Sequence, residues 1–277
     1  MSEHAFMRAL GLREENLTST CEGADVIIAV GVLPSRDNSA LTCELKTSVE
    51  KGSKLVYLFT MEDPEITPKS TFFSRYEAGS EEGVLALLAK SFLANTALPQ
   101  IYAEYFDALD DGYVSSESNI GEEEIEEIDA LCHGAKRIVL LLGEELRFHP
   151  RAAQIASFAN VMARFAGMHV MVVGATSSCE ELSECDLDEV ESIASFDGVI
   201  VYECPSVKAE EERLLIGSTQ FQMAAKVQEG DVVSVRFEDV EYKRIFKKDE
   251  LLKGVIGLLP MAQREPRYPY HVAKIVK

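Results

Sequence analysis

The sequence contains no long run of apolar residues. Its strongest apolar segments, residues 138–142 and 168–173, have the length of a strand, whereas a membrane-spanning helix needs about 18 such residues. The opening MSEHAFMRAL also lacks the basic and then apolar pattern of a signal peptide. We therefore expect a cytoplasmic protein with no direct membrane insertion.

Basic residues are scarce. The chain of 277 residues carries 27 basic and 47 acidic side chains, which gives a net charge of −20 at pH 7. A field of this sign repels the phosphates of nucleic acids and of anionic lipids, so we expect no nucleic acid among the partners. The balance changes along the chain, because nine basic and only four acidic residues lie after residue 240. This change indicates either a separate module at the end or two parts that neutralise each other.

The cysteines do not have the spacing of a metal site. The chain has six cysteines, and the closest two, Cys179 and Cys185, have five residues between them and no histidine nearby. Structural zinc and iron–sulfur sites usually contain C-x-x-C pairs, because a short loop lets two thiolates reach one ion. A cytosolic chain of this length does not need disulfides. We expect no metal ligand and no cluster in this chain.

No arrangement of residues predicts a catalytic site. Glu144 and Glu145 could form a pair of catalytic carboxylates, but adjacent loop residues point in different directions, so a role in packing or at an interface is favoured. Arg147, His149 and Arg151 lie near the start of a predicted helix, where they either dock an acidic partner or offset nearby acids. We assign no catalytic residue.

Two stretches have the pattern of one repeated unit. In the first, the apolar run 24–30 ends at Gly31, a helical segment follows a loop, and Gly52 precedes the apolar run 54–59. The second repeats this order with strand 137–142, Gly143, a helix that includes Ile155, Ala159, Met162 and Ala166, then Gly167 and strand 169–173. A strand, a helix and a strand within about 37 residues form a right-handed βαβ crossover, which predicts a parallel sheet.

The remaining segments complete the predicted organisation. A helical insertion occupies about residues 80–134, and its acidic run 121–129 is typical of a solvated helix N-terminus. A further apolar strand, 198–202, follows the second unit, and short alternating strands separated by turns follow later. We predict an α/β domain of Rossmann-like parallel βαβ units over residues 1–208 and a small β-rich, barrel-like domain over residues 209–277.

Two glycines occupy the place where α/β sheets hold anionic ligands. Gly31 and Gly143 each end a predicted parallel strand just before a helix. Neither is followed by the G-x-G-x-x-G spacing that wraps a pyrophosphate, and the second loop carries two carboxylates where a phosphate needs donors. We take Gly31, Pro34, Asn38 and Gly143 as vestigial candidates for cofactor binding.

Three segments resemble known families. Residues 24–31 and 52–56 resemble the "AD-apolar-G … G-A-K-L" unit of molybdopterin oxidoreductases. The run LLLGEEL at 140–146, followed by HPRAA at 149–153, is similar to the G subunit of bacterial NADH:quinone oxidoreductase, respiratory complex I. Residues 224–233 are similar to the start of the dinucleotide-binding β-barrel that ends molybdopterin enzymes.

The resemblance implies a molybdopterin-oxidoreductase-like fold in an electron-transfer assembly. In the G subunit, this portion is generally a cofactor-free remnant with a structural role, and the iron–sulfur clusters lie in a cysteine-rich region that has no counterpart here. Val32 and Leu33 stand where active members carry an Asn-bearing turn that contacts the cofactor. The resemblance thus implies no cofactor in this chain, iron–sulfur clusters elsewhere in the parent complex, and other peripheral-arm subunits as partners.

Two other functions remain open. The chain could be a fragment of a molybdopterin oxidoreductase that binds a pterin dinucleotide across the Gly31 and Gly143 loops. It could also be a stand-alone acidic interaction module. The respiratory role further implies a location in the cytoplasm, or on the cytoplasmic side of the inner membrane through the complex.

Overall fold

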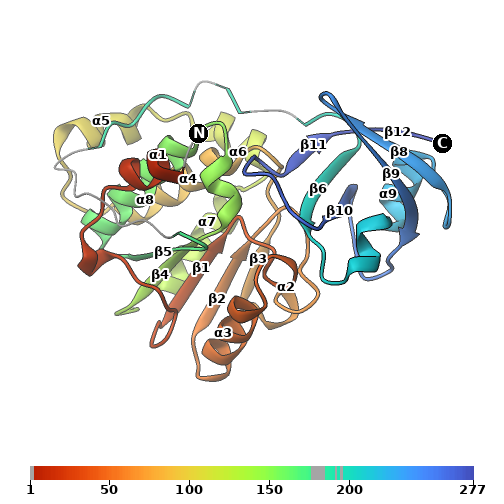
Figure 1. Ribbon diagram of the computed structural model, residues 1–277. Helices are drawn as coiled ribbons and strands as arrows, with labels where there is room; N and C mark the ends of the chain where they lie inside the picture. Colours follow the sequence, from red (N-terminus) through yellow and green to blue (C-terminus); the bar gives the residue numbers. More distant parts are fainter. Residues whose placement is uncertain (1–2, 176–184, 191, 194–195) are drawn as a thin grey trace.

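The computed structural model describes residues 3–175, 185–190, 192–193 and 196–277 and has two lobes (Figure 1). One is a five-stranded sheet with helices, which we call the α/β lobe, and the other is a seven-stranded sheet, which we call the β lobe. The predicted fold class is confirmed, because parallel βαβ units are followed by a small β-rich lobe.

The α/β lobe contains a parallel sheet with the strand order β3-β2-β1-β4-β5. Its strands are β1 (Val26–Val30), β2 (Lys54–Leu58), β3 (Phe72–Ser74), β4 (Ile138–Leu142) and β5 (His169–Val172). Every residue of β1 is buried, because β1 is central and pairs with β2 on one side and β4 on the other. Strand β3 escapes prediction from the sequence because its three residues are only half-buried and form no long apolar run.

Helices connect the strands and cover the sheet. They are α1 (Glu3–Leu10), α2 (Pro34–Asp37), α3 (Ser39–Glu50), α4 (Glu81–Leu93), α5 (Gln100–Ala108), α6 (Asp111–Ser118), α7 (Glu122–Cys132) and α8 (Ala152–Ala166). The glutamates in the first turn of α7 meet the positive end of its dipole. Helix α8 begins two residues after Pro150 and ends at Gly167, whose φ of 69° favours glycine.

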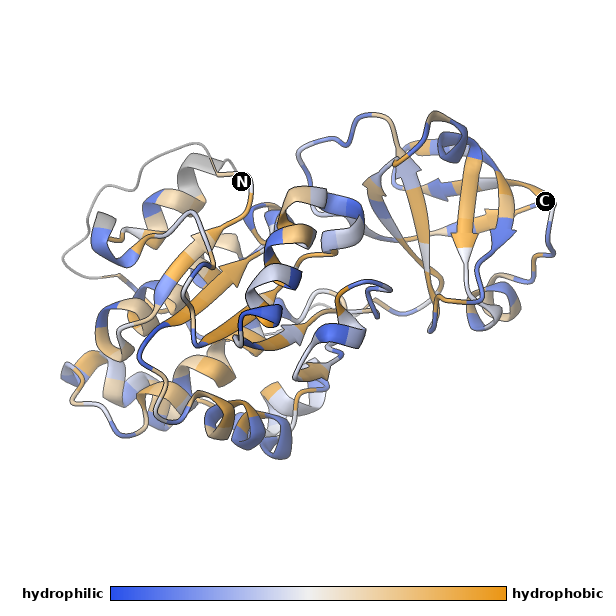
Figure 2. Cartoon of the chain, turned by 90° about the horizontal axis from the view of Figure 1, so that it is seen from below, coloured by the Kyte–Doolittle hydropathy of each residue, from blue (hydrophilic) through white to orange (hydrophobic). Residues whose placement is uncertain are grey.

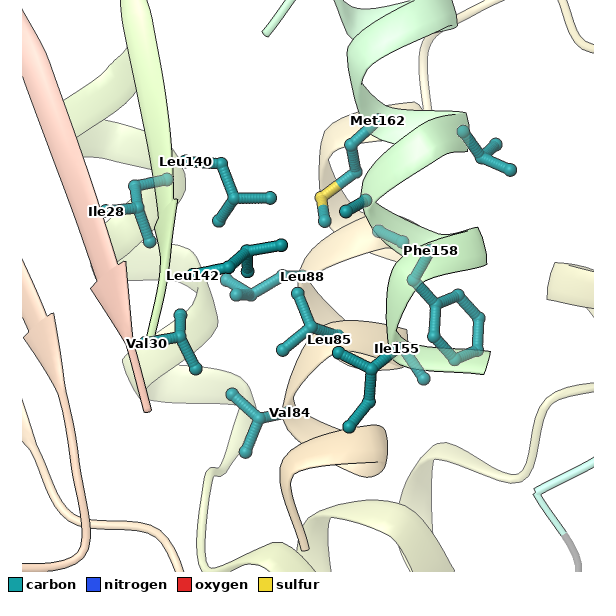
Figure 3. Packing of buried hydrophobic residues seen from close by; sticks show 14 of the residues in the cluster. Ile28, Val30, Val84, Leu85, Leu88, Leu140, Leu142, Ile155, Phe158 and Met162 are labelled. Atoms are coloured by element: carbon teal, nitrogen blue, oxygen red, sulfur yellow. The ribbon is translucent and has the colours of Figure 1, made fainter. Parts of the chain in front are cut away.

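One face of the parallel sheet packs against α4 and α8 (Figure 3). Alternate residues of β1 and β4 point to this face, and Ile155 and Met162 of α8 point back at them, whereas Phe158 points away from the sheet to Tyr105 and Phe106 of α5. The buried side chains of this region, which we call the apolar layer, are Ile28, Val30, Val84, Leu85, Leu88, Leu140, Leu142, Ile155, Phe158 and Met162. Each is buried, and burying a side chain of this size stabilises the fold by about 1.5–3 kcal/mol.

The opposite face of the sheet packs against α3 and the β lobe. Ile27 and Ala29 of β1 point to this side, where Leu41 and Leu45 of α3 meet them. Tyrosines of the β lobe belong to the same buried cluster. The two lobes therefore share a core at this face.

The β lobe contains a sheet with the order β11-β6-β10-β7-β9-β8-β12. Its elements are β6 (Ile200–Pro205), β7 (Leu214–Gly217), α9 (Thr219–Ala225), β8 (Val232–Phe237), β9 (Val240–Lys248), β10 (Ile256–Met261), β11 (Tyr270–Val272) and β12 (Lys274–Val276). Most neighbouring strands are antiparallel, but β6 with β10 and β7 with β9 are parallel pairs.

The sheet of the β lobe closes on itself. Strand β11 pairs with β6 at one end of the order, β12 pairs with β8 at the other, and only Ala273 separates β11 from β12. Inside, Phe221 packs so tightly on Gly217 and Gly257 that a Cβ on either glycine would lie 2.4 or 2.5 Å from its ring. The β lobe is therefore a small barrel filled by side chains.

Strand β6 corrects the expected assignment of residues 198–202 to the α/β domain. The strand is buried and parallel, as its apolar run indicates, but its parallel partner is β10 of the β lobe. By strand pairing, the β lobe therefore begins at Ile200 instead of residue 209. An apolar run marks a buried strand without saying which sheet buries it.

The hydropathy of the residues follows this architecture. Figure 2 shows the strands of the parallel sheet in the colour of apolar residues, whereas the helices around it are mixed. Of the helices in the described part of the chain, none combines the length and the apolarity needed to cross a membrane.

Candidate functional site

The two glycine loops lie side by side at the carboxyl edge of the parallel sheet. The Gly143 amide, after β4, donates to the Val30 carbonyl at 2.8 Å. A Cβ on Gly143 would lie 1.5 Å from the Gly31 carbonyl oxygen, and a Cβ on Gly31 would lie 2.7 Å from the side chain of Leu146. The two glycines therefore allow the loops to pack directly on each other, with Leu146 against Gly31.

Pro34 and Asn38 have local structural roles. Pro34 is buried in the first turn of α2, where its fixed φ suits the start of a helix. The Asn38 side chain caps α3, because its Oδ1 accepts a hydrogen bond from the Leu41 amide at 3.1 Å. The structure thus brings Gly31 and Gly143 together, whereas the Asn38 oxygen serves its own helix.

Three buried carboxylates gather at the same edge. Asp37 ends α2 after β1, Glu81 begins α4, and Glu145 lies in the 3-10 turn after β4. The carboxyl ends of parallel strands share one edge of a sheet, so residues far apart in the sequence meet here. Glu81 is 0% exposed, Glu145 is 1% exposed, and the side chain of Asp37 is 7% exposed. Acidic side chains are rarely buried so completely without a partner.

Three tyrosines of the β lobe supply hydroxyl groups to these carboxylates. The donor and acceptor pairs are Tyr202 with Asp37 at 3.1 Å, Tyr268 with Glu81 at 2.6 Å and Tyr270 with Glu145 at 3.5 Å. The Tyr270 ring also contacts the rings of Tyr202 and Tyr268, with centroids 4.9 and 5.2 Å apart. We call these six residues the acid–tyrosine seam.

Glu145 has the weakest hydrogen bonds in the seam. Its Oε1 accepts long hydrogen bonds from the hydroxyls of Tyr76 and Tyr270, at 3.4 and 3.5 Å. The Tyr270 hydroxyl also lies 2.8 Å from the hydroxyl of Thr60. Within the described residues, the second oxygen of Glu145, Oε2, has no hydrogen-bond partner. A carboxyl in such a place is costly when ionised and much less costly when protonated.

Glu81 faces a buried histidine. Its Oε2 lies 3.3 Å from Nε2 of His149, and neither side chain is more than 3% exposed. His149 Nδ1 accepts a hydrogen bond from the Arg151 amide at 3.0 Å, so the neutral ring carries its proton on Nε2. The Gly79 carbonyl oxygen lies 3.2 Å from Nε2 and can accept a hydrogen bond from it. The ring also stands edge-on to Tyr268 at 5.1 Å, which joins it to the seam.

Arg264 brings a positive charge to the seam. Its guanidinium lies 3.9 Å from Asp37 and 3.2 Å from Glu144. Burial nevertheless raises the pKa of Asp37 from 3.8 to about 6, against the opposing effects of Arg264, the Leu33 amide and the Tyr202 hydroxyl. The loss of hydration therefore outweighs the nearby positive charge.

The pKa of Glu145 is shifted in the same direction as the pKa of Asp37. Burial, together with the negative charges of Glu81 and Asp37, raises the pKa of Glu145 well above its ordinary 4.5. Burial also raises the pKa of each tyrosine of the seam well above 10, so the hydroxyls remain protonated donors. The seam therefore contains two carboxyls that hold their protons more tightly than in water.

Comparisons with known proteins give little further information. No model of a protein family matches the chain, and no curated protein matches it. Among solved structures, acetylene hydratase from Pelobacter acetylenicus is similar, with a TM-score of 0.43 and 10% sequence identity. The match covers 60% of this chain and 24% of that chain, so the chain spans about a quarter of its length.

The adjacent glutamates after β4 point in different directions, as predicted. Glu144 extends to Arg147 at 2.9 Å and to Arg264 at 3.2 Å, whereas Glu145 turns into the seam. In the part of the chain that the structure describes, the two carboxylates share no hydrogen-bond partner that would hold a water or a leaving group between them. Their contacts are those of packing and of the interface between the lobes.

The basic residues before α8 each meet an acid of the same chain. The pairs are Arg147 with Glu144 at 2.9 Å, His149 with Glu81 at 3.3 Å and Arg151 with Glu82 at 3.0 Å. Of the two roles considered for these residues, offsetting nearby acids is the one that the structure realises.

The cysteines form no metal site in the described ranges. Cys179 lies outside the described residues, and the other five are free thiols. Burial raises the pKa of Cys21, Cys132 and Cys204 to about 12, which makes them poor nucleophiles. Among the residues that the structure describes, no group of three His, Cys, Asp or Glu side chains could hold a metal ion.

A hollow of about 690 Å³ lies at the opposite, amino edge of the parallel sheet. Lys54 in its lining donates to the Leu131 carbonyl in the last turn of α7 at 2.9 Å, as basic side chains do at helix C-termini. The backbone amide of Lys51 caps α3, and its ammonium pairs with Glu22 at 3.1 Å. These two lysines therefore have structural partners, and we place the candidate site at the seam.

Sequence motifs miss the seam because its six residues come from five separate places in the chain. One signal is nevertheless present. Asp37 and Glu145 each follow the end of a predicted parallel strand, and Tyr268 and Tyr270 have the i, i+2 spacing that places two side chains on one face of a strand. Together, these features indicate acids at the edge of the parallel sheet and two tyrosines on one face of a later strand. Only the structure shows that these two surfaces meet.

Proposed function

We propose that this chain is a non-catalytic, structural part of a complex I-type NADH:quinone oxidoreductase, equivalent to the molybdopterin-oxidoreductase-like part of its G subunit. The resemblance of residues 24–31, 140–153 and 224–233 supports the family part of the proposal. In this role the chain carries no cofactor of its own, and other peripheral-arm subunits are its partners. The iron–sulfur clusters lie elsewhere in the complex, on the cytoplasmic side of the inner membrane.

The non-catalytic part of the proposal rests on how the carboxyl edge of the parallel sheet is filled. A pyrophosphate bound there needs free backbone N–H donors and open space beside the strand ends. Here the Gly31 and Gly143 loops touch, Leu146 packs against Gly31, and the Leu33 amide donates to Asp37 at 2.8 Å. The residues present therefore do not fit a pterin dinucleotide across the two loops.

The charge of this region supports the same conclusion. Asp37, Glu81 and Glu145 lie at the edge where a diphosphate would bind, and Arg264 is already engaged with two acids. A diphosphate at this edge would have to displace the tyrosines of the β lobe. Any carboxylate there that is ionised would also repel it, because little water screens charges in a buried site.

Purification of the native protein tests the proposal. The chain is tagged in its host, extracted under mild conditions and separated by native electrophoresis. We expect it to migrate with NADH-oxidising activity and with the other peripheral-arm subunits. The isolated chain should contain no stoichiometric iron or molybdenum, and acid extraction should release no fluorescent pterin. Stoichiometric pterin or metal in the isolated chain would support a cofactor-binding fragment, and absence from any respiratory assembly would support an independent interaction module.

A further inference from the structure

Besides the buried apolar cluster that the two lobes share, polar contacts join them, and these contacts differ from the centre to the rim. At the rim, Arg36 pairs with Glu211 at 2.7 Å, and Lys253 pairs with Glu62 at 2.9 Å. In both pairs at least one partner keeps a side-chain exposure above 20%, so water solvates it. At the centre lies the seam, where tyrosine hydroxyls of one lobe meet buried carboxyls of the other. The rim pairs are partly exposed to water, whereas the centre holds buried carboxyls whose partners across the interface are tyrosine hydroxyls and Arg264.

We propose that the acid–tyrosine seam is a pH-sensitive switch that keeps the two lobes closed while Asp37 and Glu145 hold protons and lets them separate when those protons are lost. Separation of the lobes would expose the carboxyl edge of the parallel sheet, including the loops of Gly31 and Gly143. This inference rests on the seam itself and is independent of the proposed function.

The surroundings of Glu145 explain why its ionisation opposes closure. The titratable or charged groups around the seam come from α2, β2, the loop before α4 and the start of α4, the turn after β4, and the β lobe: Asp37, Tyr57, Tyr76, Glu81, Glu144, Arg147, His149, Tyr202, Cys204, Arg264, Tyr268 and Tyr270. Arg147 pairs with Glu144, and Arg264 is shared between Glu144 and Asp37. The Arg264 guanidinium and the Tyr202 hydroxyl favour a negative charge on Glu145, but burial and the charges of Glu81 and Asp37 outweigh them. The hydroxyl hydrogen bonds that its Oε1 accepts are long, at 3.4 and 3.5 Å.

Separation of the lobes removes this cost. Once water reaches the seam, the carboxyl can ionise at its ordinary pKa, and the proton goes to solvent. The burial-induced increase in the pKa of Asp37 and Glu145 then means that opening releases protons. For Asp37 the sensitive range runs from 3.8 to about 6, and low pH favours the closed form. Each proton released raises the opening constant by up to about tenfold per pH unit within that range.

Hydrogen exchange of the full chain tests the switch. Exchange is followed by mass spectrometry between about pH 4 and about pH 8, and rates are corrected for the intrinsic pH dependence of amide exchange. The Gly79 amide, which donates to the Tyr268 hydroxyl at 2.8 Å, and the peptides of β6 and β11 report on the seam. The amides of β1 report on the α/β core. We expect opening at the seam to rise with pH at least tenfold over this range, while β1 stays protected.

Two variants separate the switch from general destabilisation. Glu145→Gln keeps the shape of the protonated side chain and cannot ionise, so its seam should open with a flatter pH dependence. Glu62→Gln removes a carboxylate that also joins the lobes but is paired at the rim, so its pH dependence should match the original protein. If Glu145→Gln fails to fold, Asp37→Asn is measured instead over about pH 4 to about pH 6. An unchanged pH dependence in the folded seam variant, or exchange at β1 that rises in parallel with the seam, would overturn the proposal.

Discussion

The apolar layer and the acid–tyrosine seam are both buried, but they are stabilised by different physics. In the apolar layer, β1 and β4 meet α4 and α8 only through hydrocarbon side chains and one thioether. Its stabilisation depends on how well the volume is filled and does not change with pH. In the seam, hydroxyls and carboxyls of two lobes meet, and the pKa of Asp37 and of Glu145 is raised. The same degree of burial therefore makes one region sensitive to cavities and the other sensitive to protons.

The largest expected effect is a cavity in the apolar layer. Phe158 is 0% exposed, so Phe158→Ala should lower the free energy of unfolding by about 3–5 kcal/mol. The loss should be equal at about pH 5 and about pH 7, because the contacts that the change removes are apolar and carry no charge at either value. Urea unfolding at both values measures it. Leu251→Ala, at a position that is 72% exposed, is the control and should change stability by less than about 0.5 kcal/mol. A loss that depends strongly on pH would break the comparison.

The next largest effect is the contribution of Asp37 to the pH dependence of the free energy of unfolding. Its folded pKa is raised from 3.8 to about 6, so its contribution is fully favourable below about 3.8 and is lost as the pH rises through about 6. This shift corresponds to about 3 kcal/mol over that range. The difference in unfolding free energy between Asp37→Asn and the original protein should therefore move by most of that amount in favour of the variant between about pH 4 and about pH 7. A constant difference would show that Asp37 titrates normally.

A smaller effect is expected from one hydroxyl of the seam. Tyr202→Phe keeps the ring but removes the donor to Asp37, which should cost about 1–3 kcal/mol at neutral pH and less near pH 4, where the carboxyl is protonated. Tyr57→Phe is a matched control, because the Tyr57 hydroxyl is equally buried and donates to the uncharged Val32 carbonyl at 3.0 Å. Thermal unfolding at both pH values measures the two variants. Equal pH dependence in the two would count against a proton-sensitive seam.

The smallest effect lies outside both regions. Asn38→Ala removes the cap of α3 and should lower the free energy of unfolding by about 1 kcal/mol at any pH. Asn38→Ser restores a capping oxygen and should recover most of the loss. Chemical unfolding with helix content followed by circular dichroism measures both. A loss well above about 2 kcal/mol, the upper end for a helix cap, or one that changes with pH, would mean that Asn38 contributes to the seam as well as to the helix.

The sequence predicts the parts of the fold that are encoded locally. The strands β1, β2, β4 and β5 lie in apolar runs, and Gly52 and Gly167 follow the ends of α3 and α8, so local patterns identify these elements. The sheet that contains β6 could not be predicted, because a parallel partner is chosen by tertiary packing. The seam could not be predicted for the same reason, since Glu81 and Tyr268 are adjacent only after the lobes have formed and met. Local sequence patterns therefore identify the helices and strands, whereas contacts between residues far apart in the sequence form the candidate site.

Tyr270 belongs both to the seam and to β11, the strand that closes the barrel against β6. Any movement of Tyr270 out of the seam therefore also disturbs the pairing of β11 with β6 that closes the barrel. An unsealed barrel has two free strand edges, and exposed edges recruit strands from other chains. If the proposed switch opens at raised pH, we expect alkaline conditions to favour aggregation that starts at residues 270–276.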